Sequence, residues 1–316
     1  MDAKIKVGIS TCLLGEKVRY DGNSKRDSYL VDVIGPFVEW VPVCPEVECG
    51  LPIPREAMRL IGNSDALCLV TIKTQKDITP QMDRWLGGKL GQLESESLCG
   101  FVFKTKSPSS AMRDAKIYSS KGVPSQKGPG IFARAFMARF PNLPVEDEGR
   151  LQDAGLRENF IERIFVLHRW QQLTRDQVRP KDLIEFHTKH KYLIMAHSPQ
   201  KLSELGRLVA HVKPESLKAA LSDYQQLLME TLKLKATVKK QVNVLHHLIG
   251  YFKRVLTFDE KQELLEVIDQ YHRELVPLIV PITLISHYVR KYNDSYLKEQ
   301  VYLHPHPIEL MLRNHV

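Results

Sequence analysis

The chain has 316 residues, 45 Lys and Arg against 37 Asp and Glu, a net charge of +8, and 43% hydrophobic residues. This composition excludes a disordered or fibrous chain, and the length suits two domains. No apolar run approaches the ~18–20 residues of a membrane span, and no secretory signal opens the sequence, so we expect a cytoplasmic protein without membrane contact.

The first half is predicted to alternate strands with helices. Runs rich in β-branched and aromatic residues occur at Lys4–Ser10, Phe37–Val43, Ala66–Ile72 and Phe101–Lys104. Between the last two runs, Thr79–Leu98 has helical periodicity with one apolar stripe. Strands that alternate with helices predict an α/β domain built on a mostly parallel sheet.

A polar stretch marks a domain boundary near the middle of the sequence. A short helix is predicted over Ile131–Phe140, stopped by Pro141. The next residues, 141–155, are polar and contain two prolines. We therefore expect an α/β domain over residues 1–148 and a second domain over residues 149–316.

The second half is predicted to be all-α. Helical periodicity dominates from Leu156 onward, and breaks fall near Pro199, Pro214, Thr257 and Pro277. The predicted helices are Asn159–Gln172, Pro180–Ala196, Gln200–Val212, Glu215–Ala236, Lys239–Leu256, Asp259–Arg273 and Pro281–Tyr292.

The five cysteines all lie in the first hundred residues, whereas all twelve histidines lie beyond residue 150. An odd number of cysteines without a secretory signal argues against a disulfide framework. Cys68, inside the third predicted strand, is expected to be a buried core residue. Cys99 precedes the fourth strand, so we expect it at the edge of the sheet opposite the other strand ends.

Three segments follow predicted strands and should meet in space. Cys12 follows the first strand, Cys44 the second, and Thr105–Ser110 the fourth. The carboxyl ends of parallel strands form one edge of a sheet, and ligands bind there. From spacing alone, Cys12 and Cys44 could be a partial ligand set, a reactive thiol pair or part of a cluster site. Zinc is disfavoured because this half contains no histidine.

Those segments resemble the motifs of the thiouracil desulfidase family. They are Ser10–Gly22 (STCLLGEKVRYDG), Val43–Glu56 (VCPEVECGLPIPRE) and Lys104–Ser110 (KTKSPSS). The second half resembles the helical domain of unknown function that often follows that family. The fused form is similar to tRNA 4-thiouridine desulfidases, which replace the sulfur of a thiolated uridine with oxygen. The segments that resemble the helical domain are Phe186–Pro199, Asn243–Lys253, Val276–Leu284 and Leu303–Asn314.

The resemblance implies a [4Fe–4S] cluster held by three cysteines, with one iron left open for the thiocarbonyl sulfur. The implied reaction is non-redox, with water supplying the oxygen and sulfide leaving. By motif, Cys12 and Cys44 are cluster ligands, Glu46 moves protons, and Ser107 donates a hydrogen bond to the substrate. The structural alternatives are a helix cap for Glu46 and a turn residue for Ser107.

The sequence departs from the family pattern at the third ligand. The motif normally ends SPSC, but its fourth position here is Ser110. Three readings stay open: a Cys-to-Ser change that disables the chain, an alternative third ligand in Cys49, or a lost cluster in an inactive RNA-binding protein. Activity on free thiouracil bases is a further alternative. A cysteine hydrolase ranks last, because its domain has no histidine to act as a base.

Basic residues near the motifs suggest that thiolated tRNA is the substrate and partner. A charge of +8 gives only weak general affinity for polyanions, so RNA binding needs a local patch. The candidates for phosphate binding near the site are Lys104, Lys106, Lys25 and Arg26. The candidates for RNA contact in the helical half are His187, His190, Lys191, Lys253 and Arg254.

Overall fold

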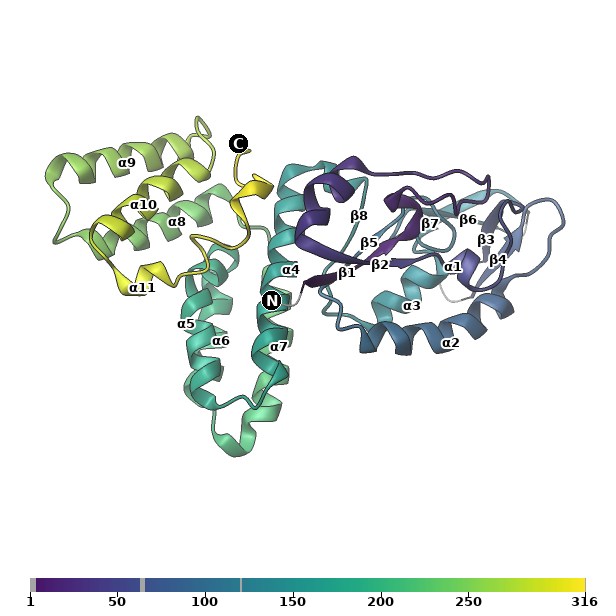
Figure 1. Cartoon of the computed structure of the whole chain (residues 1–316), viewed down its shortest axis with the longest axis horizontal. Helices are drawn as coiled ribbons and strands as arrows, with labels where there is room; N and C mark the ends of the chain where they lie inside the picture. Colours follow the sequence, from purple (N-terminus) through teal and green to yellow (C-terminus); the bar gives the residue numbers. More distant parts are fainter. Residues whose placement is uncertain (1–3, 63–65, 120, 316) are drawn as a thin grey trace. The chain divides into compact units, whose positions relative to one another are not determined.

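The computed structural model describes residues 4–62, 66–119 and 121–315 (Figure 1). It comprises two compact units, Met1–Leu156 and Arg157–Val316. Among the described residues, no helix is both long enough and apolar enough to cross a membrane.

The first unit contains the expected parallel sheet. Its strand order is β2 (Val38–Val43), β1 (Ile5–Ser10), β5 (Gly100–Phe103) and β8 (Val145–Asp147), and all three pairings are parallel. Five of the six residues of β1 are buried, as expected for a central strand covered on both faces. The α/β prediction is therefore confirmed, although the edge strand β8 was not predicted.

A second sheet was not expected from the sequence. Its order is β4 (Leu67–Thr71), β3 (Met58–Gly62), β6 (Ala115–Tyr118) and β7 (Pro124–Gly128). The pairs β3–β4 and β6–β7 are antiparallel, and β3–β6 is parallel. The third predicted strand thus belongs here and not in the parallel sheet. Four residues separate β3 from β4, which is too short a connection for parallel pairing.

The expectation that Cys68 is buried was wrong. Cys68 is exposed on β4, the edge strand of the second sheet, while the next residue, Leu69, is fully buried. Successive side chains of a strand point to opposite faces, so the same apolar run places one residue in the core and its neighbour in solvent. Cys99 is buried and lies immediately before β5.

Two helices cover one face of the parallel sheet (Figure 1). They are α2 (Thr79–Ser95) and α3 (Ile131–Arg139), close to the bounds that the sequence predicted. Phe101 of β5 packs against Phe136 of α3 with ring centroids 4.7 Å apart. Phe103, the last residue of β5 before the loop that contains Ser110, meets the same Phe136 ring edge-on at 5.6 Å.

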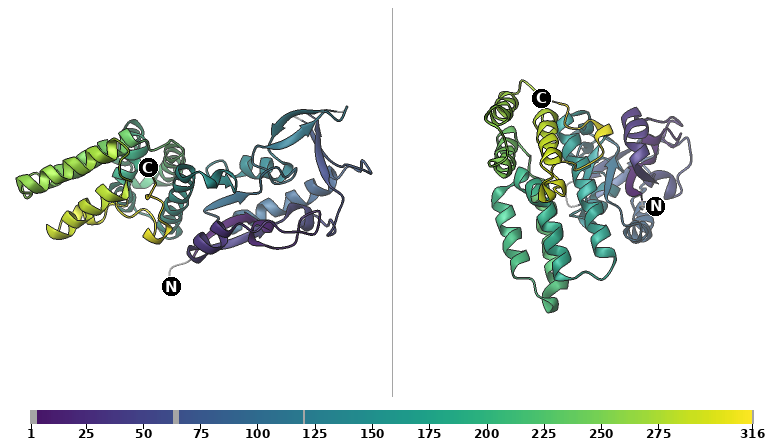
Figure 2. Two further views of the ribbon diagram at one scale, coloured as in Figure 1. Left: turned by 90° about the horizontal axis from the view of Figure 1, so that it is seen from above. Right: turned by 60° about the vertical axis from the view of Figure 1, so that its left-hand side comes forward.

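The second unit is all-helical, as predicted. Its core includes Trp170, whose ring stacks on Tyr224 at 5.2 Å and meets Phe186 edge-on. Helices α5, α6 and α7 run side by side (Figure 2). The helices of this unit are α4 (Ala154–Arg175), α5 (Pro180–His197), α6 (Pro199–Ala210), α7 (Leu217–Leu232), α8 (Val238–Ile249), α9 (Phe258–His272), α10 (Ile279–Lys291) and α11 (Ser295–Lys298).

Candidate active site

A pocket of about 280 Å³ opens at the carboxyl edge of the parallel sheet. Cys12 lies in the short 3-10 helix after β1, and Cys44 lies between β2 and α1 (Pro45–Glu48). Ser110 lies in the loop after β5, and all three residues line the pocket. The three loops meet because their strands are neighbours in one parallel sheet.

Backbone contacts hold these loops in place. The Ser10 hydroxyl accepts a hydrogen bond from the Lys104 backbone N–H at 3.0 Å, which joins the ends of β1 and β5. The Cys12 carbonyl accepts N–H bonds from Gly15 and Lys25. Gly15 has φ +101°, a conformation that favours glycine. The Cys12 turn is therefore fixed by the local chain.

The two pocket cysteines are neutral thiols when no metal is bound. Burial raises the pKa of Cys12 to about 11, although the charge of Lys104 opposes the shift. Burial also raises the pKa of Cys44. Buried thiols resist ionisation because the thiolate loses its hydration. A metal that binds here must therefore displace two protons.

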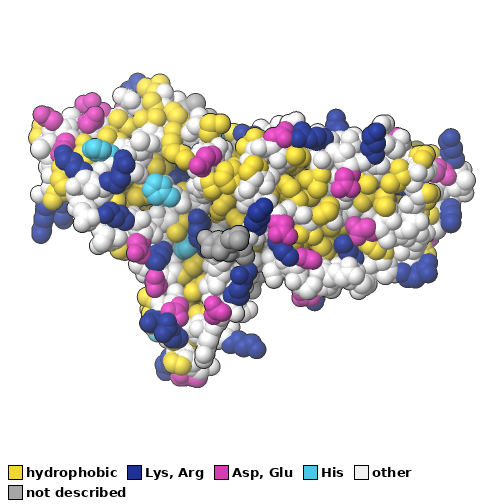
Figure 3. All heavy atoms as spheres, viewed as in Figure 1, with side chains coloured by type: hydrophobic (Ala, Val, Ile, Leu, Met, Phe, Trp, Pro, Cys, Tyr) yellow, Lys and Arg dark blue, Asp and Glu magenta, His cyan; other side chains and the backbone are white. Residues whose placement is uncertain are grey.

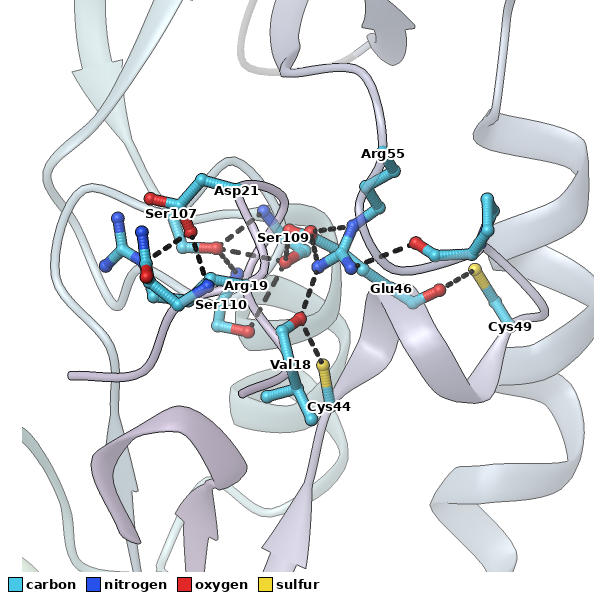
Figure 4. Close-up of polar contacts among 12 residues, drawn as sticks. Val18, Arg19, Asp21, Cys44, Glu46, Cys49, Arg55, Ser107, Ser109 and Ser110 are labelled. Carbon is cyan, nitrogen blue, oxygen red and sulfur yellow. Dashed lines mark hydrogen bonds and ion pairs between the residues drawn. The ribbon is translucent and has the colours of Figure 1, made fainter. Parts of the chain in front are cut away.

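Glu46 is paired with a buried arginine (Figure 4). Its Oε2 accepts a hydrogen bond from Arg55 Nε at 2.8 Å and a second from Arg55 Nη2. The two side chains are only 12% and 5% exposed. Arg55 also donates to the Val18 carbonyl at 2.9 Å, so it ties the Glu46 carboxylate to the loop after Cys12. Sequence reasoning missed Arg55, although it lies inside the second motif.

A chain of hydroxyls leads from the pocket to Glu46. Ser109 Oγ donates to Glu46 Oε1 at 2.8 Å and lies 3.0 Å from Ser107 Oγ. Ser107 Oγ also accepts hydrogen bonds from the backbone N–H groups of Ser109 and Ser110. Ser107 therefore stabilises the turn, as its structural alternative predicted. Glu48, not Glu46, accepts the backbone N–H of Cys44, the N-cap residue of α1, at 2.8 Å. Glu46 therefore points into the pocket wall instead of capping the helix.

The third donor in the pocket is a hydroxyl. Ser110 is buried, and its Oγ lies 3.4 Å from Ser109 Oγ. Cys49 does not line the pocket; its thiol donates to the Glu46 carbonyl at 3.3 Å and packs against the hydrophobic core. Within the described residues, no three His, Cys, Asp or Glu side chains are grouped to bind a metal. Two thiols and a hydroxyl do not fit a cluster held by three thiolates.

The basic residues expected to bind phosphate differ in whether they line the pocket and whether their charge is paired. Lys104 lines the pocket, but its ammonium group pairs with Glu148. Lys106 also lines the pocket and is exposed. Lys25 and Arg26 are exposed but do not line the pocket, and Arg26 pairs with Asp32 at 2.5 Å. Lys106 is thus the best placed of the four for a phosphate.

The candidate RNA residues of the second unit separate into buried and exposed groups. His190 is buried, and its ring stacks on Phe186 with centroids 3.9 Å apart. Because it is buried, its side chain is not accessible to RNA. His187 is partly buried and contacts Tyr224 Oη at 3.1 Å. Burial lowers the pKa of His187 to about 4 and that of His190 to about 3, so neither is a cation at neutral pH.

The lysine and arginine candidates remain accessible. Lys191 is partly exposed, with its ammonium group 5.5 Å from the centre of the Tyr192 ring. Lys253 and Arg254 are exposed at the end of the turn after α8. These two side chains therefore offer positive charge to solvent without structural rearrangement.

Comparison with known proteins identifies the first unit. Residues 7–148 match the 2-thiouracil desulfurase family. The chain is also 32% identical to the solved structure of the [4Fe–4S]-dependent thiouracil desulfidase TudS, over 47% of this chain and 94% of that one, with a TM-score of 0.39. The chain belongs to the thiouracil desulfidase family. The resemblance seen in the sequence is confirmed.

The helical unit of this desulfidase-family protein has relatives of its own. Residues 191–307 match a domain described as a protein of unknown function, DUF1722. The chain is 32% identical over 153 residues to Uncharacterized protein YbgA of Escherichia coli (strain K12), which covers 48% of this chain and 90% of YbgA. The protein is therefore a fusion of a desulfidase-family unit with a DUF1722 unit.

Proposed function

We propose that the first unit binds the base of 4-thiouridine in tRNA and is built to replace its sulfur with oxygen, and that Ser110 leaves this chain without a needed thiolate. The observation that carries the proposal is the common pocket of Cys12, Cys44 and Ser110. These are the three positions at which the family motif has cysteines. Glu46 forms part of the same wall.

The cofactor proposal follows from the relative and from position 110 together. TudS is named as [4Fe–4S]-dependent. A cluster with three protein ligands and one open iron would need Cys12, Cys44 and a third thiolate. Serine is a harder and much less acidic ligand, so the chain with Ser110 should hold such a cluster poorly.

The chain's own residues supply proton transfer to the reaction. Water adds oxygen to the thiocarbonyl carbon, the carbon–sulfur bond breaks, and hydrogen sulfide leaves, so the substrate is neither oxidised nor reduced. Glu46 is placed to accept the proton of the attacking water. Ser107 and Ser109 connect that carboxylate with the pocket interior. Arg55 keeps the carboxylate in one orientation through its two hydrogen bonds.

A whole tRNA is favoured over a free base by features of the second unit. Exposed Lys253 and Arg254 adjoin Tyr251, which is 42% exposed and stacks on Tyr296 at 5.4 Å. Tyr296 is partly buried, and cations beside a partly exposed aromatic pair are typical of surfaces that bind single-stranded or looped RNA. The alternative substrate is free thiouracil, which the name of TudS favours.

The test compares this chain with Ser110→Cys after anaerobic reconstitution with iron and sulfide. Ser95→Cys, which adds an exposed thiol on α2, controls for non-specific iron. We expect cluster absorbance, iron and acid-labile sulfide in Ser110→Cys alone. We also expect only this variant to remove 4-thiouridine from bulk tRNA, measured by nucleoside mass spectrometry.

Other outcomes would redirect the proposal. Activity in both chains would mean that another group, such as Cys49, completes the site, and adding Cys49→Ala would then abolish it. Activity of Ser110→Cys on thiouracil but not on tRNA would select the free-base reaction. A full cluster in Ser110→Cys with Cys44→Ala added would refute the ligand assignment.

A further inference from the structure

A second pocket, of about 320 Å³, lies within the helical unit, and its lining includes no residue discussed as catalytic. It is formed by α10, α11 and the C-terminal segment from Leu303 to Asn314. Its volume lies in the range of small-molecule sites. The desulfidase proposal assigns it no role.

Every ionisable side chain that lines this pocket is basic. They are Arg290, Lys298, His304, His306 and Arg313, and no carboxylate is among the lining residues. Arg290 and Lys298 are exposed and, in the described part of the chain, form no ion pair. Figure 3 shows Lys, Arg and His side chains over the part of the helical unit formed by α10 and α11. The mouth of the pocket therefore favours an anion.

The charge of Arg313 is already balanced inside the protein. Arg313 is buried, donates to the Tyr302 carbonyl at 2.6 Å, and its guanidinium nitrogens lie 3.4 Å from Glu158 and 3.7 Å from Glu162. The positive charge available to a ligand thus comes from Arg290 and Lys298. The Arg313 nitrogens that face Glu158 and Glu162 are Nε and Nη2, so the proposal assigns them no ligand contact.

The pocket also contains an unused hydrogen-bond acceptor. His306 Nδ1 lies 3.2 Å from the Pro307 carbonyl, which can only accept, so Nδ1 bears the proton. Burial lowers the pKa of His306, so the ring is neutral and its Nε2 is an acceptor. That atom and Ser286 Oγ are buried, with no hydrogen-bond partner in the described structure. Buried polar atoms without partners are costly and call for a ligand or a water molecule.

The remaining wall is apolar. Ile282 and Leu312 lie in its buried part, and Ile308 and Met311 are 69% and 65% exposed at its edge. A simple anion would leave this wall unused, and a fatty acid would leave His306 Nε2 and Ser286 Oγ unpaired. A nucleotide satisfies all three parts of the pocket. Its phosphate suits the cations at the mouth, its base and ribose supply hydrogen-bonding groups for the unpaired polar atoms, and the flat base packs on the apolar wall.

We propose that this pocket binds a nucleoside phosphate, with the phosphate near Arg290 and Lys298 and the nucleoside against the apolar wall. The ligand could be a free nucleotide or one nucleotide of an RNA, since both present the same groups. The inference goes beyond the desulfidase proposal and does not depend on a cluster.

The test is calorimetric titration of the full-length chain with uridine 5′-monophosphate, uridine and inorganic phosphate. We expect saturable binding of the nucleotide, at least tenfold tighter than of either part. Arg290→Ala/Lys298→Ala should weaken nucleotide binding at least tenfold, whereas Lys261→Ala, an exposed lysine on α9, should not. Both changes are at exposed side chains, and circular dichroism would verify the fold.

Two results would overturn the proposal: nucleotide binding no tighter than phosphate binding, or nucleotide binding unchanged in Arg290→Ala/Lys298→Ala. A titration of the same variants with deacylated tRNA distinguishes a free nucleotide from a nucleotide that is part of an RNA. A loss of both tRNA and nucleotide affinity supports an RNA nucleotide, and a loss of nucleotide affinity alone supports a free nucleotide. Desulfidase activity is measured separately, so the two proposals can fail independently.

Discussion

At the scale of single residues, the charge of the pocket in the first unit is set by ion pairs and by the protonation of its thiols. Glu46 is paired with Arg55, Lys104 is paired with Glu148, and the two pocket thiols are protonated. The motifs predicted that Cys12, Cys44 and position 110 belong together. They did not predict Arg55 or Ser109 as partners of Glu46, because side-chain pairing across loops leaves no periodic trace in the sequence.

Removal of Arg55 should leave the Glu46 carboxylate buried without its cation. We expect Arg55→Ala to lower the free energy of unfolding by about 3 kcal/mol or more, as for other broken buried ion pairs. Equilibrium urea unfolding measures this loss. The double variant Arg55→Ala/Glu46→Gln should recover part of it, and no recovery would mean that Arg55 acts through packing alone.

Labelling of Cys12 should depend on pH in a way that reports its burial. With a pKa of about 11 instead of 9.0, the thiolate fraction near neutral pH falls about 100-fold. In the metal-free chain, iodoacetamide labelling of Cys12, followed by peptide mass spectrometry, should still rise between pH 9 and 11. In the urea-unfolded chain it should reach half its maximum near pH 9 and level off about one to two pH units higher. A half-maximum near pH 9 in the folded chain would contradict the shift.

At the scale of elements, the site loops are held by close contacts with the elements behind them. Gly130, the N-cap residue of α3, packs against the backbone of the Ser107–Ser110 loop. In the second unit, α4 and α5 are joined by Glu162 Oε1 and His197 Nε2 at 2.6 Å. Periodicity predicted these helices well, but not the contacts between them.

A β-carbon at Gly130 would lie 2.5 Å from the Ser109 carbonyl group. We expect Gly130→Ala to displace the loop that contains Ser107 and Ser110, and to lower cluster content and activity in the Ser110→Cys background several-fold. Gly88→Ala is the matched control. It lies in α2 with open space around it, and should stabilise the chain by about 0.5–1 kcal/mol. Equal effects of the two changes would contradict this account.

The buried pair of Glu162 and His197 should make the second unit sensitive to acid. Burial alone raises the pKa of Glu162, but the hydrogen bond and charge of His197 and the charge of Arg313 outweigh burial and lower it below 4.5. The stability from this pair is therefore present above pH 4.5 and is lost as the pH falls through the lowered value. The Glu162→Gln variant should have a lower free energy of unfolding than the parent chain at pH 7. It should also lose less of that free energy than the parent as the pH falls from 5 to 3.5. Urea unfolding at three pH values measures both effects.

At the scale of the whole molecule, the protein joins a unit that has a desulfidase-family pocket to a basic helical unit. If tRNA is the substrate, exposed cations of the helical unit should contribute to its affinity. The net charge of +8 is spread over 316 residues, so this contribution must come from local patches.

The salt dependence of tRNA binding tests that contribution. Each lost phosphate contact reduces the slope of log affinity against log salt by about 0.7–0.9. We expect Lys253→Ala/Arg254→Ala to reduce the slope by about 1–2 relative to the parent chain, whereas Lys261→Ala leaves it within error. Filter binding across a salt series measures the slopes. An unchanged slope in the double variant would remove this surface from the RNA interface.

The sequence by itself determined the strands around the first site, the helices of the second unit, and the family. These features depend on local periodicity and on linear motifs, and Cys12, Cys44 and Ser110 follow strands whose parallel pairing brings their ends together. Only the tertiary structure decided the second sheet, the exposure of Cys68, the direction of Cys49 away from the pocket, the pairing of Arg55 with Glu46, and the basic pocket beside α10. Each of these depends on contacts between residues that no pattern along the chain connects, because burial and pairing are fixed by the packing of whole elements.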